Sequence, residues 1–95
     1  MIENLSWQDA NITWKDLKGW LIRDNKPGEE EYPYTIVSRV EDGGDETFWL
    51  TGLYWLESLE EVLNNYKAFG TRQVLDVECS FNKDLSDIIL IEKLF

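Results

Sequence analysis

Two adjacent glycines between alternating segments constrain this fold more than any other feature of the sequence. Residues 34–41 and 46–54 both alternate apolar and polar side chains and are rich in β-branched and aromatic residues. This alternation is typical of strands that bury one face. Residues 42–45 place two glycines between two aspartates, and such a pair favours a tight turn between strands. The sequence therefore predicts an antiparallel β-hairpin.

The alternation within this hairpin also predicts which side chains are buried. One face carries Tyr34, Ile36, Val40, Phe48, Leu50 and Tyr54. The other face carries Thr35, Val37, Arg39, Glu41, Thr47, Trp49 and Thr51. We expect helices to cover the first face, which leaves Trp49 exposed on the second. A register shifted by one residue would bury Trp49 instead, because neighbouring side chains point to opposite faces of a sheet.

Residues 13–23 have the 3.6-residue periodicity of an amphipathic helix. The apolar side chains that would share one face are Trp14, Leu17, Trp20 and Leu21. Thr13 and Asp16 have the spacing of a capped helix N-terminus. Gly19 lowers helix stability by about 1 kcal/mol relative to Ala. We therefore expect a helix here, with a strand over residues 17–23 as the alternative.

A second helix is expected between Ser58 and Gly70. Ser58 and Glu61 have the spacing of a capping box, in which each side chain accepts a hydrogen bond from the other residue's backbone N–H. An apolar stripe follows at helical spacing and consists of Leu59, Val62, Leu63, Tyr66 and Phe69. Gly70 stands where a glycine commonly ends a helix.

Two further strands complete the predicted fold. Residues 73–81 alternate, with Leu75, Val77, Cys79 and Phe81 facing inward and Asp76, Glu78 and Ser80 facing outward. Residues 88–91 are uniformly apolar, as expected of a strand covered on both faces. The element order is then α-β-β-α-β-β. We expect residues 1–95 to form a single α+β domain, a four-stranded antiparallel sheet with two helices packed on one face.

The composition excludes several functions. The chain has 19 acidic residues, 9 basic residues and no histidine, so its formal net charge is −10. Direct binding to nucleic acid is therefore not expected. Without histidine the chain lacks the commonest general base and metal ligand. A single cysteine excludes a disulfide framework and a cysteine-based zinc site. No nucleophile elbow or phosphate-binding loop occurs, so we expect no enzymatic activity, no metal and no cofactor.

The sequence also indicates a compartment. Residues 1–6 lack the basic and apolar regions of a signal peptide. No apolar run approaches the roughly 20 residues that a membrane-spanning helix needs. We expect a cytoplasmic protein that does not bind a membrane.

Acidic clusters and one tryptophan are the strongest functional signals. The clusters are Glu29–Glu31; Glu41, Asp42, Asp45 and Glu46; Glu57, Glu60 and Glu61; and Asp76 with Glu78. Such clusters can simply keep a protein soluble, or they can imitate the spaced phosphates of a nucleic acid. Trp and Arg are residue types that dominate binding hot spots. The predicted partner-binding residues are therefore Trp49, Arg39, Glu41, Asp42, Asp45, Glu46, Asp76 and Glu78.

Two functions are compatible with these observations. The first is a non-enzymatic inhibitor that occupies the basic, nucleic-acid-binding surface of a partner protein. In size and acidity the chain is similar to phage-encoded and mobile-element inhibitors of host nucleases, restriction systems and CRISPR effectors. The alternative is a structural or adaptor protein that acts through homo-oligomerisation or through its exposed sheet face.

Overall fold

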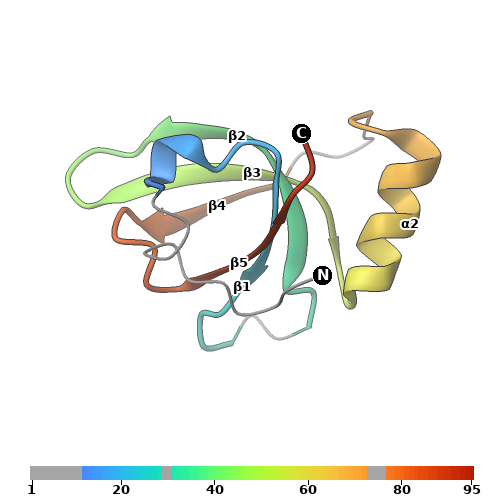
Figure 1. Cartoon of the computed structure of the whole chain (residues 1–95). Helices are drawn as coiled ribbons and strands as arrows, with labels where there is room; N and C mark the ends of the chain where they lie inside the picture. The colour runs from blue at the N-terminus through green and yellow to red at the C-terminus, as the bar shows by residue number, and fades with distance from the viewer. Residues whose placement is uncertain (1–11, 29–30, 73–76) are drawn as a thin grey trace.

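The computed structural model describes residues 12–28, 31–72 and 77–95 (Figure 1). Within these ranges the elements are, in chain order, the 3-10 helix η1 (Trp14–Asp16), the strands β1 (Trp20–Asp24), β2 (Tyr34–Asp42) and β3 (Thr47–Leu56), the α-helix α2 (Leu59–Phe69), and the strands β4 (Val77–Asn82) and β5 (Ile88–Lys93). The strands pair antiparallel in one five-stranded sheet of order β4-β3-β2-β1-β5.

The predicted four-stranded sheet with two helices in α-β-β-α-β-β order is wrong. The described residues form five strands with one α-helix, and the error lies in residues 13–23. This segment consists of η1, a turn at Gly19 and β1. Gly19 has a φ of +89°, and a Cβ added there would collide with the carbonyl oxygen of Phe95. The alternative of a strand over residues 17–23 is closer, since β1 begins at Trp20.

The helical periodicity of this segment has another origin, the burial of β1 on both faces. β1 lies between β2 and β5. Its consecutive residues Leu21 and Ile22 are both fully buried, yet they belong to different apolar clusters. A short strand buried on both faces shows no alternation, and its periodicity cannot be distinguished from that of a buried helix.

The larger apolar cluster lies on the inner face of a curled sheet (Figure 1). Its buried members are Leu17, Trp20, Ile22, Val37, Phe48, Leu50, Phe81, Leu85, Ile88 and Leu90. These include residues of β4 and β5, the two outermost strands of the sheet order. Both edges therefore contribute to one core, so the curled sheet encloses its inner face without an α-helix. From η1, Trp14 packs onto this core with its ring centroid 5.4 Å from that of Phe48.

The second cluster lies on the outer face, under α2. It contains Leu21, Ile36, Leu53, Val62 and Ile91. The helix has the predicted caps: Ser58 Oγ accepts from the Glu61 N–H at 3.2 Å, and the Gly70 N–H donates to the Tyr66 carbonyl at 2.8 Å. The second predicted helix is therefore confirmed. Phe69, which the stripe predicted to be buried, is 52% exposed at its C-terminal end.

The predicted hairpin is confirmed as β2 and β3, but a β-bulge at Ser38 changes which residues face the core. Val37 pairs with Gly52 while Arg39 pairs with Thr51, so Ser38 is an extra residue on β2. An inserted residue reverses the phase of the alternation beyond it. Thr35 and Val37, predicted to lie beside Trp49, are consequently fully buried.

The last two strands agree with the prediction where the structure describes them. β5 occupies the predicted apolar run at 88–91, and β4 covers the second half of residues 73–81. In β4, Phe81 is buried as predicted, whereas Val77 is 39% exposed. Leu75 and Asp76 lie outside the described residues. In the part of the chain that the structure describes, no helix has the length and apolarity needed to cross a bilayer.

Candidate protein-binding face

Trp49 lies at the middle of an open part of the sheet. The residue is 43% exposed, and it lies on β3 directly opposite Glu41 of β2 and Ser80 of β4. The next residue of β3 on the same face is Thr51, which has Arg39 opposite it on β2 and Glu78 opposite it on β4. We call the surface formed by Arg39, Glu41, Trp49, Glu78 and Ser80 the Trp49 face.

The Trp49 face is a continuation of the surface that α2 covers. Trp49, Thr51 and Leu53 follow at alternate positions of β3 and therefore share one face. Leu53 packs in the cluster under the helix, while Trp49 is closer along β3 to the β2–β3 turn. That turn lies at the end of the sheet away from α2 (Figure 1). The prediction that Trp49 lies opposite the helix-covered face is therefore wrong. The helix is on the outer face because the curled sheet already fills the inner one.

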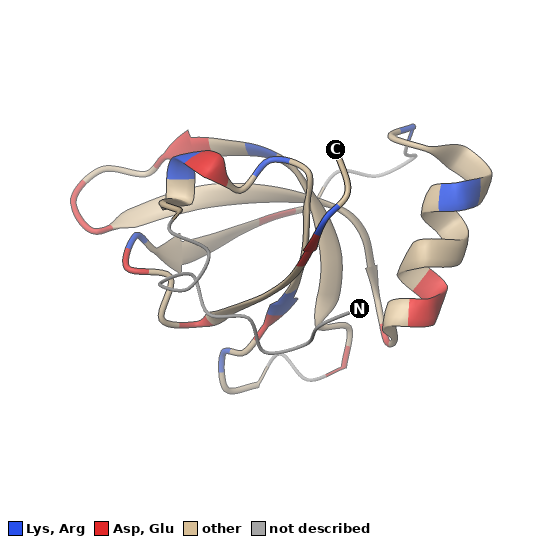
Figure 2. Cartoon of the chain, in the orientation of Figure 1, with Lys and Arg blue, Asp and Glu red and all other residues tan. Residues whose placement is uncertain are grey.

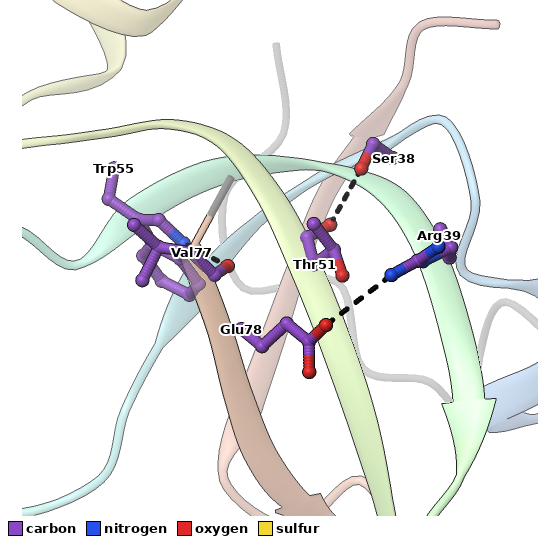
Figure 3. Close-up of polar contacts among 6 residues, drawn as sticks. All are labelled: Ser38, Arg39, Thr51, Trp55, Val77 and Glu78. Atoms are coloured by element: carbon purple, nitrogen blue, oxygen red, sulfur yellow. Dashed lines mark hydrogen bonds and ion pairs between the residues drawn. The ribbon is translucent and has the colours of Figure 1, made fainter. Parts of the chain in front are cut away.

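An ion pair crosses β3 beside Trp49. Arg39 Nη2 lies 3.3 Å from Glu78 Oε1, above Thr51, as Figure 3 shows. The two side chains are 62% and 45% exposed, so the pair contributes about 0–1 kcal/mol to stability. It covers Thr51, which is only 4% exposed, and it compensates the charges of both partners. Glu41 makes no ion pair with any residue that the structure describes.

Hydrogen bonds to backbone carbonyls fix the strands beneath this face (Figure 3). Ser38 Oγ donates to the Thr51 carbonyl at 3.1 Å, which holds the bulge in place. Trp55 Nε1 donates to the Val77 carbonyl at 3.3 Å and ties the start of β4 to β3. The backbone that presents Trp49 is therefore held on both sides.

Asp42 does not belong to the Trp49 face. It pairs with Phe48 on the inner side of the hairpin, and its Oδ1 lies 2.7 Å from Lys83 Nζ. The hydrogen bond from Lys83, and then that from the Gly44 N–H, lowers the pKa of the Asp42 carboxyl below its ordinary value of 3.8. Asp42 therefore stabilises the turn, and its charge is compensated locally.

The other predicted acids have different positions. Asp45 and Glu46 are exposed in the β2–β3 turn, outside the strands that carry the Trp49 face. Asp76 lies outside the described residues. Within the described ranges, no group of three His, Cys, Asp or Glu side chains is placed to hold a metal ion. The structure thus brings Arg39, Glu41, Trp49 and Glu78 together and separates Asp42 from them.

Sequence reasoning missed the residue that covers the edge of β4. Lys26, in the β1–β2 loop, donates from Nζ to the Ser80 carbonyl at 2.9 Å, and its Nζ lies 4.1 Å from the ring centroid of Phe81. A lysine at a sheet edge hinders pairing with another chain. Lys26 and Ser80 are 54 residues apart, so no local pattern could have indicated this contact.

The chemistry of the Trp49 face follows from its five side chains. The side chains of the Trp49 face offer an indole ring, carboxylates, a guanidinium and one hydroxyl. Cys79 pairs with Leu50 and is half-buried on the inner face. An aromatic ring surrounded by charged groups is the composition of a protein-binding hot spot and its rim.

No protein-family model matches this chain, and neither the curated proteins nor the solved structures provide a match.

Proposed function

We propose that this chain is a non-enzymatic protein-binding module whose contact surface is the Trp49 face. Its partner is a DNA- or RNA-handling protein, and the chain inhibits that protein by occupying its basic, nucleic-acid-binding surface. The observation that carries the proposal is the 43% exposure of Trp49 at the centre of an open sheet face. We further propose that the protein acts in the cytoplasm.

The position of Trp49 supports a role in binding. β3 is an interior strand of the sheet, and a Thr or Val would satisfy its β-propensity equally well. Burial of apolar surface contributes about 25 cal/mol per Å² of free energy. A partner that buries the exposed indole ring would therefore gain substantial binding free energy. The ion pair between Arg39 and Glu78 can form part of a polar rim that excludes water from the contact.

The charge of the chain supports a basic partner. Glu41 adjoins Trp49, and Asp45 and Glu46 extend the acidic surface to the turn, as the red segments of Figure 2 show at the hairpin end. With a net charge of −10, the molecule attracts basic surfaces over distances of the order of the Debye length, about 10 Å at 0.1 M salt. This attraction would place the hairpin end against the groove that normally binds phosphates.

Affinity capture with matched variants tests the proposal. The tagged chain is incubated with lysate of the cells that encode it, at low and at high salt, and with or without added DNA. We expect it to retain a nucleic-acid enzyme that high salt or DNA releases. Trp49→Ala should lose this partner, whereas Phe69→Ala, which removes a similarly exposed aromatic ring from α2, should retain it.

A different outcome would support an assembly role through the same face. That outcome is a solution mass above 11.2 kDa that Trp49→Ala reduces to the monomer, with no salt-sensitive partner. A Trp49→Ala variant that keeps the partner at wild-type level would contradict both roles for this face.

A further inference from the structure

We propose that the Trp49 face binds an arginine side chain of its partner, with the guanidinium stacked on the Trp49 ring and paired with the Glu41 carboxylate. The inference rests on the proposed function, because it names the group that the same face recognises.

The first observation is the register of the hairpin. Glu41 and Trp49 are directly opposite on neighbouring antiparallel strands, so their side chains leave the same face of the sheet. The Cβ atoms of such a pair are about 4.5–5.5 Å apart. A cation over the indole ring is therefore within reach of the Glu41 carboxylate.

The second observation is that neither group has a cationic partner among the described residues. Arg39, the cation of the Trp49 face, is held by Glu78 at 3.3 Å. Elsewhere in the described chain cations do lie over aromatic rings. These contacts are Lys15 and Lys83 over Trp14, Arg23 over Tyr34 and Lys26 over Phe81. Trp49 has no such contact in this part of the molecule and leaves its exposed surface to a cation from outside.

The chemistry of this site favours arginine over lysine. A guanidinium is planar, so it can stack on an indole while its edge donates two parallel hydrogen bonds to a carboxylate. An ammonium is a strongly hydrated point charge and cannot do both with the same geometry. Arginine is also the residue that basic proteins use to pair with phosphates, which links this site to the proposed class of partner.

Titration of the whole, ¹⁵N-labelled chain with two peptides tests this inference. The probes are peptides of alternating Gly and Arg or of alternating Gly and Lys, equal in length and charge. The indole N–H signals of the five tryptophans report on each ring separately. We expect the arginine peptide to shift the Trp49 indole signal and the Glu41 backbone signal, with a dissociation constant about fivefold below that of the lysine peptide.

Three variants assign the effect to the two side chains. Glu41→Gln should raise the dissociation constant of the arginine peptide about fivefold, and Trp49→Leu should abolish the preference for arginine. Trp49→Phe should keep part of it, because a phenyl ring binds cations more weakly than an indole. Glu60→Gln, on α2, should leave binding unchanged. The spectrum of each free variant shows whether the chain remains folded.

Equal affinity for the two peptides, or shifts centred on Glu60 and Glu61 of α2, would overturn the inference. If Trp49→Ala still abolishes capture of the natural partner, the protein-binding function stands and only the arginine assignment fails. If capture is also independent of Trp49, the proposed function fails as well.

Discussion

Lys83 connects three parts of the chain at the β2–β3 turn. Its Nζ lies 2.7 Å from Asp42 Oδ1, donates to the Asp45 carbonyl at 3.0 Å and lies 5.4 Å from the ring centroid of Trp14. The hydrogen bond from Lys83 is the main cause of the lowered pKa of Asp42. The partly buried Lys83 side chain therefore joins the hairpin, η1 and the loop after β4.

The lowered pKa of Asp42 predicts a pH dependence of stability. A carboxyl whose folded-state pKa is depressed stabilises the fold above its unfolded pKa of 3.8, and this contribution is lost as the pH falls through the folded-state value. We expect the melting temperature of Asp42→Asn to be below that of the wild type at pH 6 and to converge with it as the pH falls below 3.8 and the Asp42 carboxyl becomes protonated. Thermal melts from pH 2 to 7 measure this. A constant difference across that range would contradict it.

Gly19 predicts a second effect at a single residue. An added Cβ meets the backbone of Phe95, and φ is +89°. Gly28 has nearly the same φ, +88°, but open space around it. We expect Gly28→Ala to cost about 1 kcal/mol of backbone strain and Gly19→Ala to cost about 1–3 kcal/mol more, from overpacking. Urea unfolding measures both, and equal losses would show that the Phe95 contact contributes nothing.

At the scale of elements, the hairpin and α2 could be predicted because their signals are local. Strand alternation, a Gly-Gly turn and a Ser58–Glu61 cap all lie within a few residues of the structure they specify. β1 could be predicted only as the alternative to a helix, since burial on both faces removes its alternation. The order of the sheet depends on pairing between β1 and β5, which are more than 60 residues apart.

The candidate site could likewise be predicted only in part from the sequence. Arg39, Glu41 and Trp49 share a face because they follow the bulge, so their predicted alternation is correct. Thr35 and Val37 precede the bulge, so the simple alternation assigns them to the wrong face of the sheet. The residue type of Ser38 does not indicate that a bulge lies there. Asp42 is separated from this group because β2 continues to Asp42, and its side chain therefore points to the face opposite that of Glu41.

The edge of β4 gives a prediction at the element scale. Lys26 covers the Ser80 carbonyl, and without it this edge presents unpaired backbone groups. We expect Lys26→Met to raise the average mass in sedimentation at high protein concentration. Lys67→Met, which removes an exposed lysine from α2, should not. If both variants sediment like the wild type, Lys26 does not protect this edge.

At the scale of the whole molecule, the net charge of −10 acts across the entire fold. The radius of gyration is 12.2 Å, so at 0.01 M salt, where the Debye length is about 30 Å, the acids repel one another across the molecule. At 0.1 M salt that length is about 10 Å, and repulsion is confined to neighbours. Folding brings the charges together, so screening should stabilise the folded state more than the unfolded chain.

We therefore expect the melting temperature to rise by several degrees between 0.01 and 0.1 M NaCl. In a domain of this size, an increase of about 1 kcal/mol in the free energy of unfolding raises the melting temperature by about 4–8 °C. The triple variant Glu46→Gln, Glu57→Gln and Glu92→Gln changes the net charge from −10 to −7, as −10 + 3 = −7, at exposed positions without a described ion pair. It should melt higher at low salt and respond less to added NaCl. A melting temperature that falls with salt would mean that attractive pairs such as Asp42–Lys83 outweigh the repulsion, and the acids would then be neutral or favourable for the fold.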